Sequence, residues 1–175
     1  MCLTVFVRIL GIDPGLQKTG WGIIESEGHK LSYVSCGLIK TTKSRTLPER
    51  LHEIDSGMAY VIDAFKPDQA AIEETFVNNN AASALKLGLA GGVAMVVPAR
   101  NGLIVGEYPA NLVKKSVVGA GKAGKDQVGM MIRTLLPACG KIGEDEADAL
   151  AVAICHAHHA ESRKRFGGIM AGAAR

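Results

Sequence analysis

Residues 9–24, ILGIDPGLQKTGWGII, decide the fold, because they place a tight turn between two strand-like runs and a carboxylate where the first run ends. The apolar residues before Asp13 and the run that opens at Thr19 both favour β-strands. Pro14 fixes φ and Gly15 permits a tight turn between them. Gly15, Gly20 and Gly22 have no side chains, so the backbone around Asp13 is open to close approach by a ligand.

Strand and helix signals alternate along the rest of the chain. A third strand-like run at 30–40 completes a meander, and Thr46 with Glu49 forms a capping box before a helix that reaches residue 65. The remaining signals are strands at 69–74 and 102–108, a helix at 80–97 that ends before Pro98, two short helices between 110 and 136, and a helix from about 144 to 159. This order predicts an α/β fold, a five-stranded mixed sheet with helices on both faces.

Length and composition fit one compact domain. The chain has 175 residues, 47% of them hydrophobic, and a formal net charge of only +3. We expect a single domain over 1–160 and a basic, flexible tail over 161–175. The four cysteines form no CxxC pair, which favours reduced thiols in the cytoplasm over a disulfide framework or a zinc site. The apolar start is too short to span a bilayer and has no basic leader, so we expect no membrane role.

Four carboxylates lie at the ends of predicted elements. Asp13 and Glu73 end strands, and Asp145 and Asp148 open the last helix. One fold can therefore gather them, and clustered carboxylates repel each other unless cations bind between them. Mg²⁺ prefers oxygen ligands, so the pattern points to a divalent metal site and to phosphate chemistry.

Each carboxylate also has a simpler interpretation. Asp13 suits a turn, and acids in a first helical turn complement the helix dipole. Neighbouring residues on a strand face opposite sides, so only one of Glu73 and Glu74 can join Asp13, and the residues alone do not choose between them.

Four stretches together resemble the RuvC family of Holliday junction endonucleases, in the ribonuclease H-like superfamily. They are residues 9–24, AIEETFVNNNAASALKLGLAGGVA (71–94), VKKSVVGAGKAGKDQV (113–128) and DEADALAVAICHAHH (145–159). The resemblance implies a ribonuclease H-like fold and a homodimer that resolves junctions by paired nicks in recombination and repair. It also implies two Mg²⁺ per site, with Mn²⁺ as a possible substitute, and partnership with the RuvA–RuvB branch-migration complex.

The same resemblance assigns roles to individual residues. It implies that the four acids bind metal and that the acid on the second strand is Glu73. It further implies that Phe76 stacks on an unpaired base and that Lys114 and Lys125 contact phosphates. Two departures from the family pattern are the residues before Arg8 and an extra acid, Glu146, beside Asp145.

Several other signals compete with this interpretation. Residues 119–125 nearly match a P-loop, but Asp126 replaces the hydroxyl residue that Mg²⁺ needs, and a basic loop that contacts phosphate fits better. Histidines at 156, 158 and 159 favour a solvated helix end. Glycines at 88, 91 and 92 destabilise a helix interior, so they favour either close packing on the sheet or a helix pair across a dimer. The rival functions are a nuclease for RNA or RNA–DNA hybrids, a junction-binding protein without catalysis, and an actin-like ATPase half.

Overall fold

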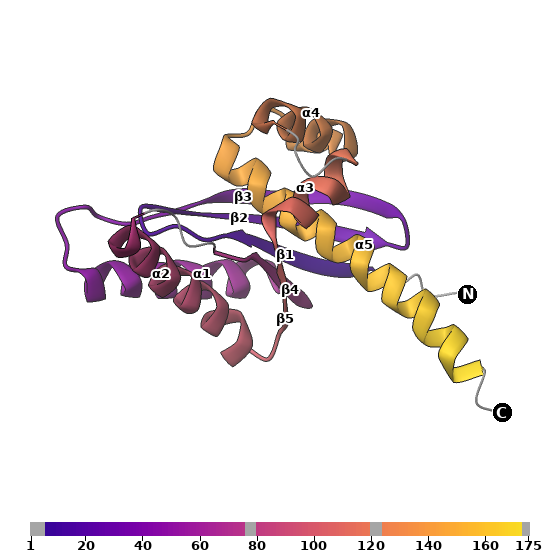
Figure 1. Cartoon of the computed structure of the whole chain (residues 1–175), viewed down its shortest axis with the longest axis horizontal. Helices are drawn as coiled ribbons and strands as arrows, with labels where there is room; N and C mark the ends of the chain where they lie inside the picture. Colours follow the sequence, from indigo (N-terminus) through magenta and orange to yellow (C-terminus); the bar gives the residue numbers. More distant parts are fainter. Residues whose placement is uncertain (1–5, 76–79, 120–123, 173–175) are drawn as a thin grey trace.

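The computed structural model describes residues 6–75, 80–119 and 124–172, with side chains omitted at Lys125 and from 161 onward. A five-stranded sheet forms its centre (Figure 1), in the spatial order β3-β2-β1-β4-β5. The strands are β1 (Val7–Asp13), β2 (Lys18–Glu27), β3 (Lys30–Lys40), β4 (Gln69–Glu73) and β5 (Ile104–Tyr108). The first three form an antiparallel meander, whereas β4 runs parallel to both β1 and β5. The predicted mixed sheet is confirmed.

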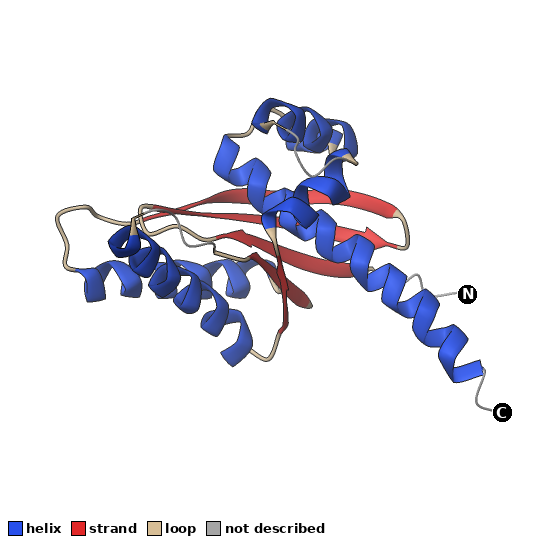
Figure 2. Cartoon of the chain, viewed as in Figure 1, coloured by secondary structure: helices blue, strands red, loops and turns tan. Residues whose placement is uncertain are grey.

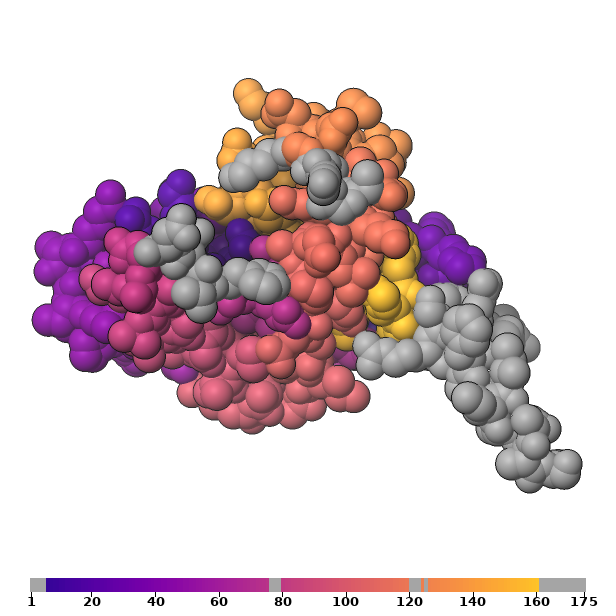
Figure 3. Space-filling model, viewed as in Figure 1, coloured from indigo at the N-terminus to yellow at the C-terminus, as the bar shows by residue number. Residues whose placement is uncertain are grey.

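Helices cover both faces of this sheet (Figure 2). One face carries α1 (Leu47–Phe65) and α2 (Ala81–Arg100), and the other carries α3 (Ala110–Val118), α4 (Lys125–Leu135) and α5 (Glu144–Gly172), with a short 3₁₀ turn, η1 (Pro137–Cys139), after α4. Each face has its own hydrophobic core, so the fold has three layers. The space-filling view in Figure 3 shows α3 and α4 next to each other at the surface.

Strand alternation decides which residues reach which core. Leu10 and Ile12 of β1 pack toward α1 and α2, whereas Ile9 packs toward α5. Gly11 also faces α5, because a Cβ added to it would lie 2.1 Å from the carbonyl oxygen of Ala149. Residues two apart share a face, so Asp13 lies on the α5 side of the sheet.

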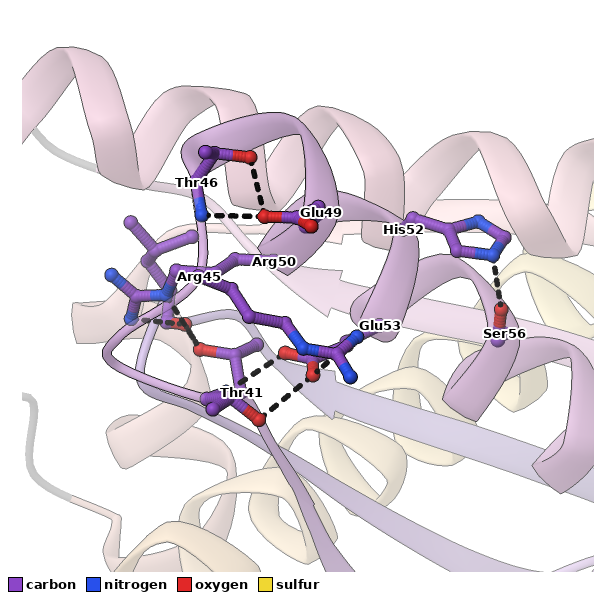
Figure 4. Close-up of polar contacts among 10 residues, drawn as sticks. Thr41, Arg45, Thr46, Glu49, Arg50, His52, Glu53 and Ser56 are labelled. Atoms are coloured by element: carbon purple, nitrogen blue, oxygen red, sulfur yellow. Dashed lines mark hydrogen bonds and ion pairs between the residues drawn. The ribbon is translucent and has the colours of Figure 1, made fainter.

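The start of α1 follows the predicted capping box. The Glu49 carboxylate accepts hydrogen bonds from the Thr46 backbone N–H at 2.8 Å and from the Thr46 hydroxyl at 2.7 Å (Figure 4). Helix α1 ends at Phe65, and its C-cap residue, Lys66, has a φ of 47° in the left-handed region. These local signals fix both ends of the helix.

The prediction that the second helix ends before Pro98 is wrong, since α2 continues to Arg100. Proline removes only one backbone donor near a helix end, and the buried Pro98 ring adds to the core. The Pro98 carbonyl accepts from the backbone N–H groups of Asn101 and Leu103, both at 3.1 Å, so the end of the helix is capped.

The prediction that the last helix ends near His159 is also wrong, because α5 extends to Gly172. No proline or glycine interrupts residues 144–166, and the charged residues after 160 are good helix formers. Flexibility of the tail remains a prediction.

Candidate active site

Asp13 and Glu73 meet at one end of the sheet. Parallel pairing of β1 with β4 sets Ile12 beside Ile72, so the next two residues, Asp13 and Glu73, are also neighbours. Ala71 belongs to the core under α5, and alternation places Glu73 on that same face. The same alternation turns Glu74 to the other face, although both Glu73 and Glu74 border a hollow with Gly88 and Gly91 of α2. Packing on the sheet makes the choice that the sequence left open.

The start of α5 lies over the same end of the sheet. Gly20 is the β2 partner of Asp13, and a Cβ added to Gly20 would lie 2.3 Å from the carbonyl oxygen of Asp145. Helix and sheet touch here backbone to backbone, which only glycine allows. This contact brings the first turns of α5, with Asp145 and Asp148, to the strand that carries Asp13.

The electrostatics of Glu73 reflect this gathering. Burial raises the pKa of the Glu73 carboxyl above its usual value, and the negative charge of Asp148 raises it further. The Lys114 ammonium of α3 acts in the opposite direction on the same pKa. Glu73, Asp148 and Lys114 are thus electrostatic neighbours, and a bound cation would relieve the repulsion between the two acids.

Asp145 faces a cation that sequence reasoning missed. The Lys18 ammonium, at the start of β2, lies 3.7 Å from Asp145 Oδ2. Alternation puts Lys18 on the same face as Gly20, which is the α5 side. Only tertiary structure brings these two residues together, since 126 positions separate them. The extra acid, Glu146, acts on a different group: burial raises the pKa of the Cys36 thiol on β3, and the negative charge of Glu146 raises it further.

The four acids supply only oxygen ligands, the donor type that hard divalent cations prefer. Within the described ranges, no group of three or more histidine, cysteine, aspartate or glutamate side chains is close enough to hold a metal ion. The fold therefore brings the four acids to one end of the sheet without drawing three of the side chains into a ready ligand set.

The residues expected to contact DNA are only partly described. Lys114 lies on α3, half-buried and beside the acids. Lys125 opens α4, but its side chain is not described, and Phe76 lies outside the described residues.

The prediction that the three late histidines form a solvated helix end is wrong for His156. This side chain is only 4% exposed, with Nδ1 3.0 Å from the Tyr108 hydroxyl and Nε2 2.9 Å from Gln69 Oε1. The His156 side chain therefore connects α5 to Tyr108 of β5 and Gln69 of β4. Helical spacing from Ala149 through Val152 and Ala153 to position 156 was the signal that placed it on the buried face.

The sheet has the strand order β3-β2-β1-β4-β5, and acids lie at the ends of two adjacent strands and at the start of a covering helix. This arrangement is that of an α/β protein with the ribonuclease H-like fold. Comparison with known proteins agrees, since the family profile described as "Crossover junction endodeoxyribonuclease RuvC" matches residues 9–156. The chain belongs to the RuvC family.

Individual relatives support this membership. A protein from Paramagnetospirillum magneticum named "Crossover junction endodeoxyribonuclease RuvC" is 57% identical over 91% of this chain and 96% of its own length. A Rhodopseudomonas palustris (strain TIE-1) protein of the same name is 54% identical over 91% of this chain and 92% of its own. Among solved structures, T. thermophilus RuvC in complex with Holliday junction substrate has a TM-score of 0.83 at 31% identity, covering 89% of this chain and 96% of that one.

Proposed function

We infer that this chain is a crossover junction endodeoxyribonuclease that resolves Holliday junctions during homologous recombination and DNA repair. The observation that carries this inference is the family match over residues 9–156, the span that contains all four acids. The T. thermophilus relative bound to its junction substrate supports the choice of DNA substrate. Hydrolysis gives a 5′-phosphate and a 3′-hydroxyl end.

The RuvC family consists of metal-dependent nucleases, and we propose that Asp13, Glu73, Asp145 and Asp148 hold two Mg²⁺ ions, with Mn²⁺ as a possible substitute. When bound, these ions supply Lewis acidity to the attacking water and to the leaving 3′ oxygen. The oxygen-only donor set and the raised pKa of Glu73 support the assignment. Among the described residues no three acids lie close enough to hold a metal ion, so binding would draw at least three of these carboxylates together.

The chain's own cations position the substrate. Lys114, whose positive charge lowers the pKa of Glu73, would hold a phosphate oxygen beside the acids. Lys125 would contact the backbone at the start of α4, and Phe76 would stack on an unpaired base at the junction. The ion pair between Lys18 and Asp145, both partly exposed, sets one positive charge beside the acids before metal binds.

We propose that the protein is a homodimer paired through α2. Leu85, Leu89 and Val96 on this helix are 68%, 40% and 57% exposed, and a Cβ on Gly88 or Gly92 would meet nothing within 4 Å. By length and composition alone α2 could also cross a membrane, but a core helix passes the same test, and α2 packs on the sheet through other residues. A two-fold dimer presents two sites to a four-way junction and so permits paired nicks.

The dimer is tested by Leu89→Glu, which places a charge on the exposed apolar face. We expect analytical ultracentrifugation to show a dimer for the wild type and a monomer for the variant. Tyr60→Glu is the control, because Tyr60 is an exposed apolar residue on α1, 73% accessible. A monomeric wild type would overturn the proposal.

Further parts of the function follow from family membership. We propose action in the cytoplasm together with the RuvA–RuvB complex. Co-sedimentation of purified RuvA, RuvB and this protein on a four-way junction tests the partnership, and exclusion of the protein from that assembly would contradict it.

The activity is tested with three labelled substrates, namely a synthetic four-way junction, a linear duplex and an RNA–DNA hybrid. We expect metal-dependent nicking of the junction at symmetric positions and little cutting of the other two. Preferential hybrid cutting would identify a hybrid nuclease, and junction binding without nicking would identify a non-catalytic binding protein.

A further inference from the structure

A hollow lies on the α1 and α2 side of the turn that follows Asp13. Its volume is about 380 Å³, and its lining comes from the turn and from both helices. The lining residues are Leu16, Gln17, Arg50, Ser83, Lys86 and Leu87. Two of these residues are cations from different helices, and none of them is acidic. The lining therefore favours an anion, and the Glu53 carboxylate, which interacts with Arg50 from outside the hollow, offsets part of this positive charge.

Arg50 is held in place before any ligand arrives. Its Nη2 donates to the Leu16 carbonyl at 3.1 Å, and its Nε donates to Thr41 Oγ1 at 2.9 Å. The Thr41 hydroxyl in turn donates to the same Leu16 carbonyl at 2.6 Å. Figure 4 shows Arg50 extending from α1 toward Thr41. These bonds use two of the five guanidinium N–H donors and fix the plane of the group, so little side-chain entropy is lost when it binds an anion.

The second cation comes from α2. Lys86 is exposed, and Ser83 lies about one turn earlier on the helix. The Ser83 backbone N–H is already bonded to Asn80 Oδ1 at 3.1 Å. The side chains of Arg50, Lys86 and Ser83, rather than the helix terminus, thus provide the donors.

We propose that this hollow binds one backbone phosphate of the junction strand whose scissile phosphate lies at the acids, an inference that rests on the proposed function. The turn between Asp13 and Lys18 lies between the acids and the hollow. The acids are on its α5 side, and the hollow is on its α1 and α2 side. A strand that crosses this end of the sheet passes both. Guanidinium, ammonium and hydroxyl donors suit a phosphate, and contacts to the backbone fix register without reading sequence.

The test uses the nicking-deficient Asp13→Asn protein and a fluorescent four-way junction, with binding measured by anisotropy across a series of salt concentrations. Lys86→Gln in this background should weaken binding roughly twofold to fivefold, as for one exposed charge pair. It should also lower the slope of log K against log salt by about one per protomer. Lys86→Arg keeps the charge and should restore both values.

Lys30→Gln is the matched control, because it removes the same charge at the opposite end of the sheet. In the β1–β2 register Asp13 pairs with Gly20, whereas Val7 pairs with Ser26, near the hairpin that leads to Lys30. Lys30→Gln should leave affinity and slope near the parent values. Equal effects of the Lys86 and Lys30 substitutions would overturn the phosphate site while leaving the proposed function intact.

Replacing one phosphate at a time near the cut with a neutral methylphosphonate identifies which phosphate the hollow binds. At one position the loss should be large for the parent and small for Lys86→Gln, which is the non-additivity expected of a direct pair. Additive losses at every position would reject the site. If the parent protein fails to prefer the junction over duplex, the proposed function fails first, and the phosphate site fails with it.

Discussion

The two faces of the sheet are built differently, although the same strands supply both. The α1 and α2 face presents branched side chains, and Leu10, Ile12 and Ile23 there are fully buried. The α5 face presents Gly11, Gly20 and Gly22, each so close to α5 that a Cβ would overlap it. Large side chains hold helices at an ordinary packing distance, whereas glycines let α5 reach the backbone of the sheet. The carboxylates that we propose to hold the metal ions lie on the second, closely packed face.

The largest expected effect concerns the chemistry that this close packing permits. Asp13→Asn should reduce junction nicking on the order of 1000-fold or more, because it removes a carboxylate that acts together with the other three. Junction binding should persist, and the melting temperature in chelator should rise slightly because one repelling charge is gone. Gel assays of nicking and anisotropy measure the two effects. Nicking at the wild-type rate would remove Asp13 from the site.

A substitution at the contact itself tests the packing difference. Gly11→Val should lower the free energy of unfolding by roughly 3 kcal/mol or more, since its Cβ would collide with the backbone of Ala149. Ile12→Val, one residue along on the other face, should cost only about 1 kcal/mol. Urea denaturation monitored by circular dichroism measures both. Similar losses for the two variants would show that the faces do not differ in tolerance.

The buried polar network under α5 should have a smaller effect. His156→Ala leaves the Tyr108 hydroxyl and Gln69 without this partner, which should cost about 1–3 kcal/mol of unfolding free energy. His52→Ala, at an exposed position on α1 where the ring meets the Ser56 hydroxyl at 3.5 Å, is the control and should change little. If both histidines can be replaced without loss, the network does not contribute to stability.

The smallest effect is the pH dependence that Glu73 causes. The pKa of the Glu73 carboxyl is higher in the folded protein than in the unfolded chain. The free energy of unfolding is therefore highest below the unfolded-state pKa, where Glu73 is protonated in both states, and it falls as pH rises through the folded-state pKa. Glu73→Gln should therefore raise the melting temperature of the metal-free protein at pH 7 and have little effect near pH 4. Thermal melts in chelator at both pH values measure this difference. A variant less stable than the wild type at pH 7 would contradict the sign.

Local signals predicted most of the elements correctly. The Thr46–Glu49 box and the apolar spacing after it located α1, and the turn at Pro14 and Gly15 located the first hairpin. The errors were at two helix ends. Whether α2 continues past Pro98, and α5 past His159, depends on burial and on helix propensity together. His156 was misjudged because its polarity was weighed above its helical spacing.

The sequence by itself determined the order of strands and helices, the family, and which carboxylates end their elements, because hydrophobic period, turn residues and caps act over a few positions. Tertiary structure decided that Glu73 rather than Glu74 faces Asp13, that Lys18 pairs with Asp145, and that Arg50 and Lys86 share a hollow. These outcomes depend on which face of a strand is covered and on contacts between residues far apart in the chain. No local pattern encodes such contacts, since they exist only once the helices have packed on the sheet.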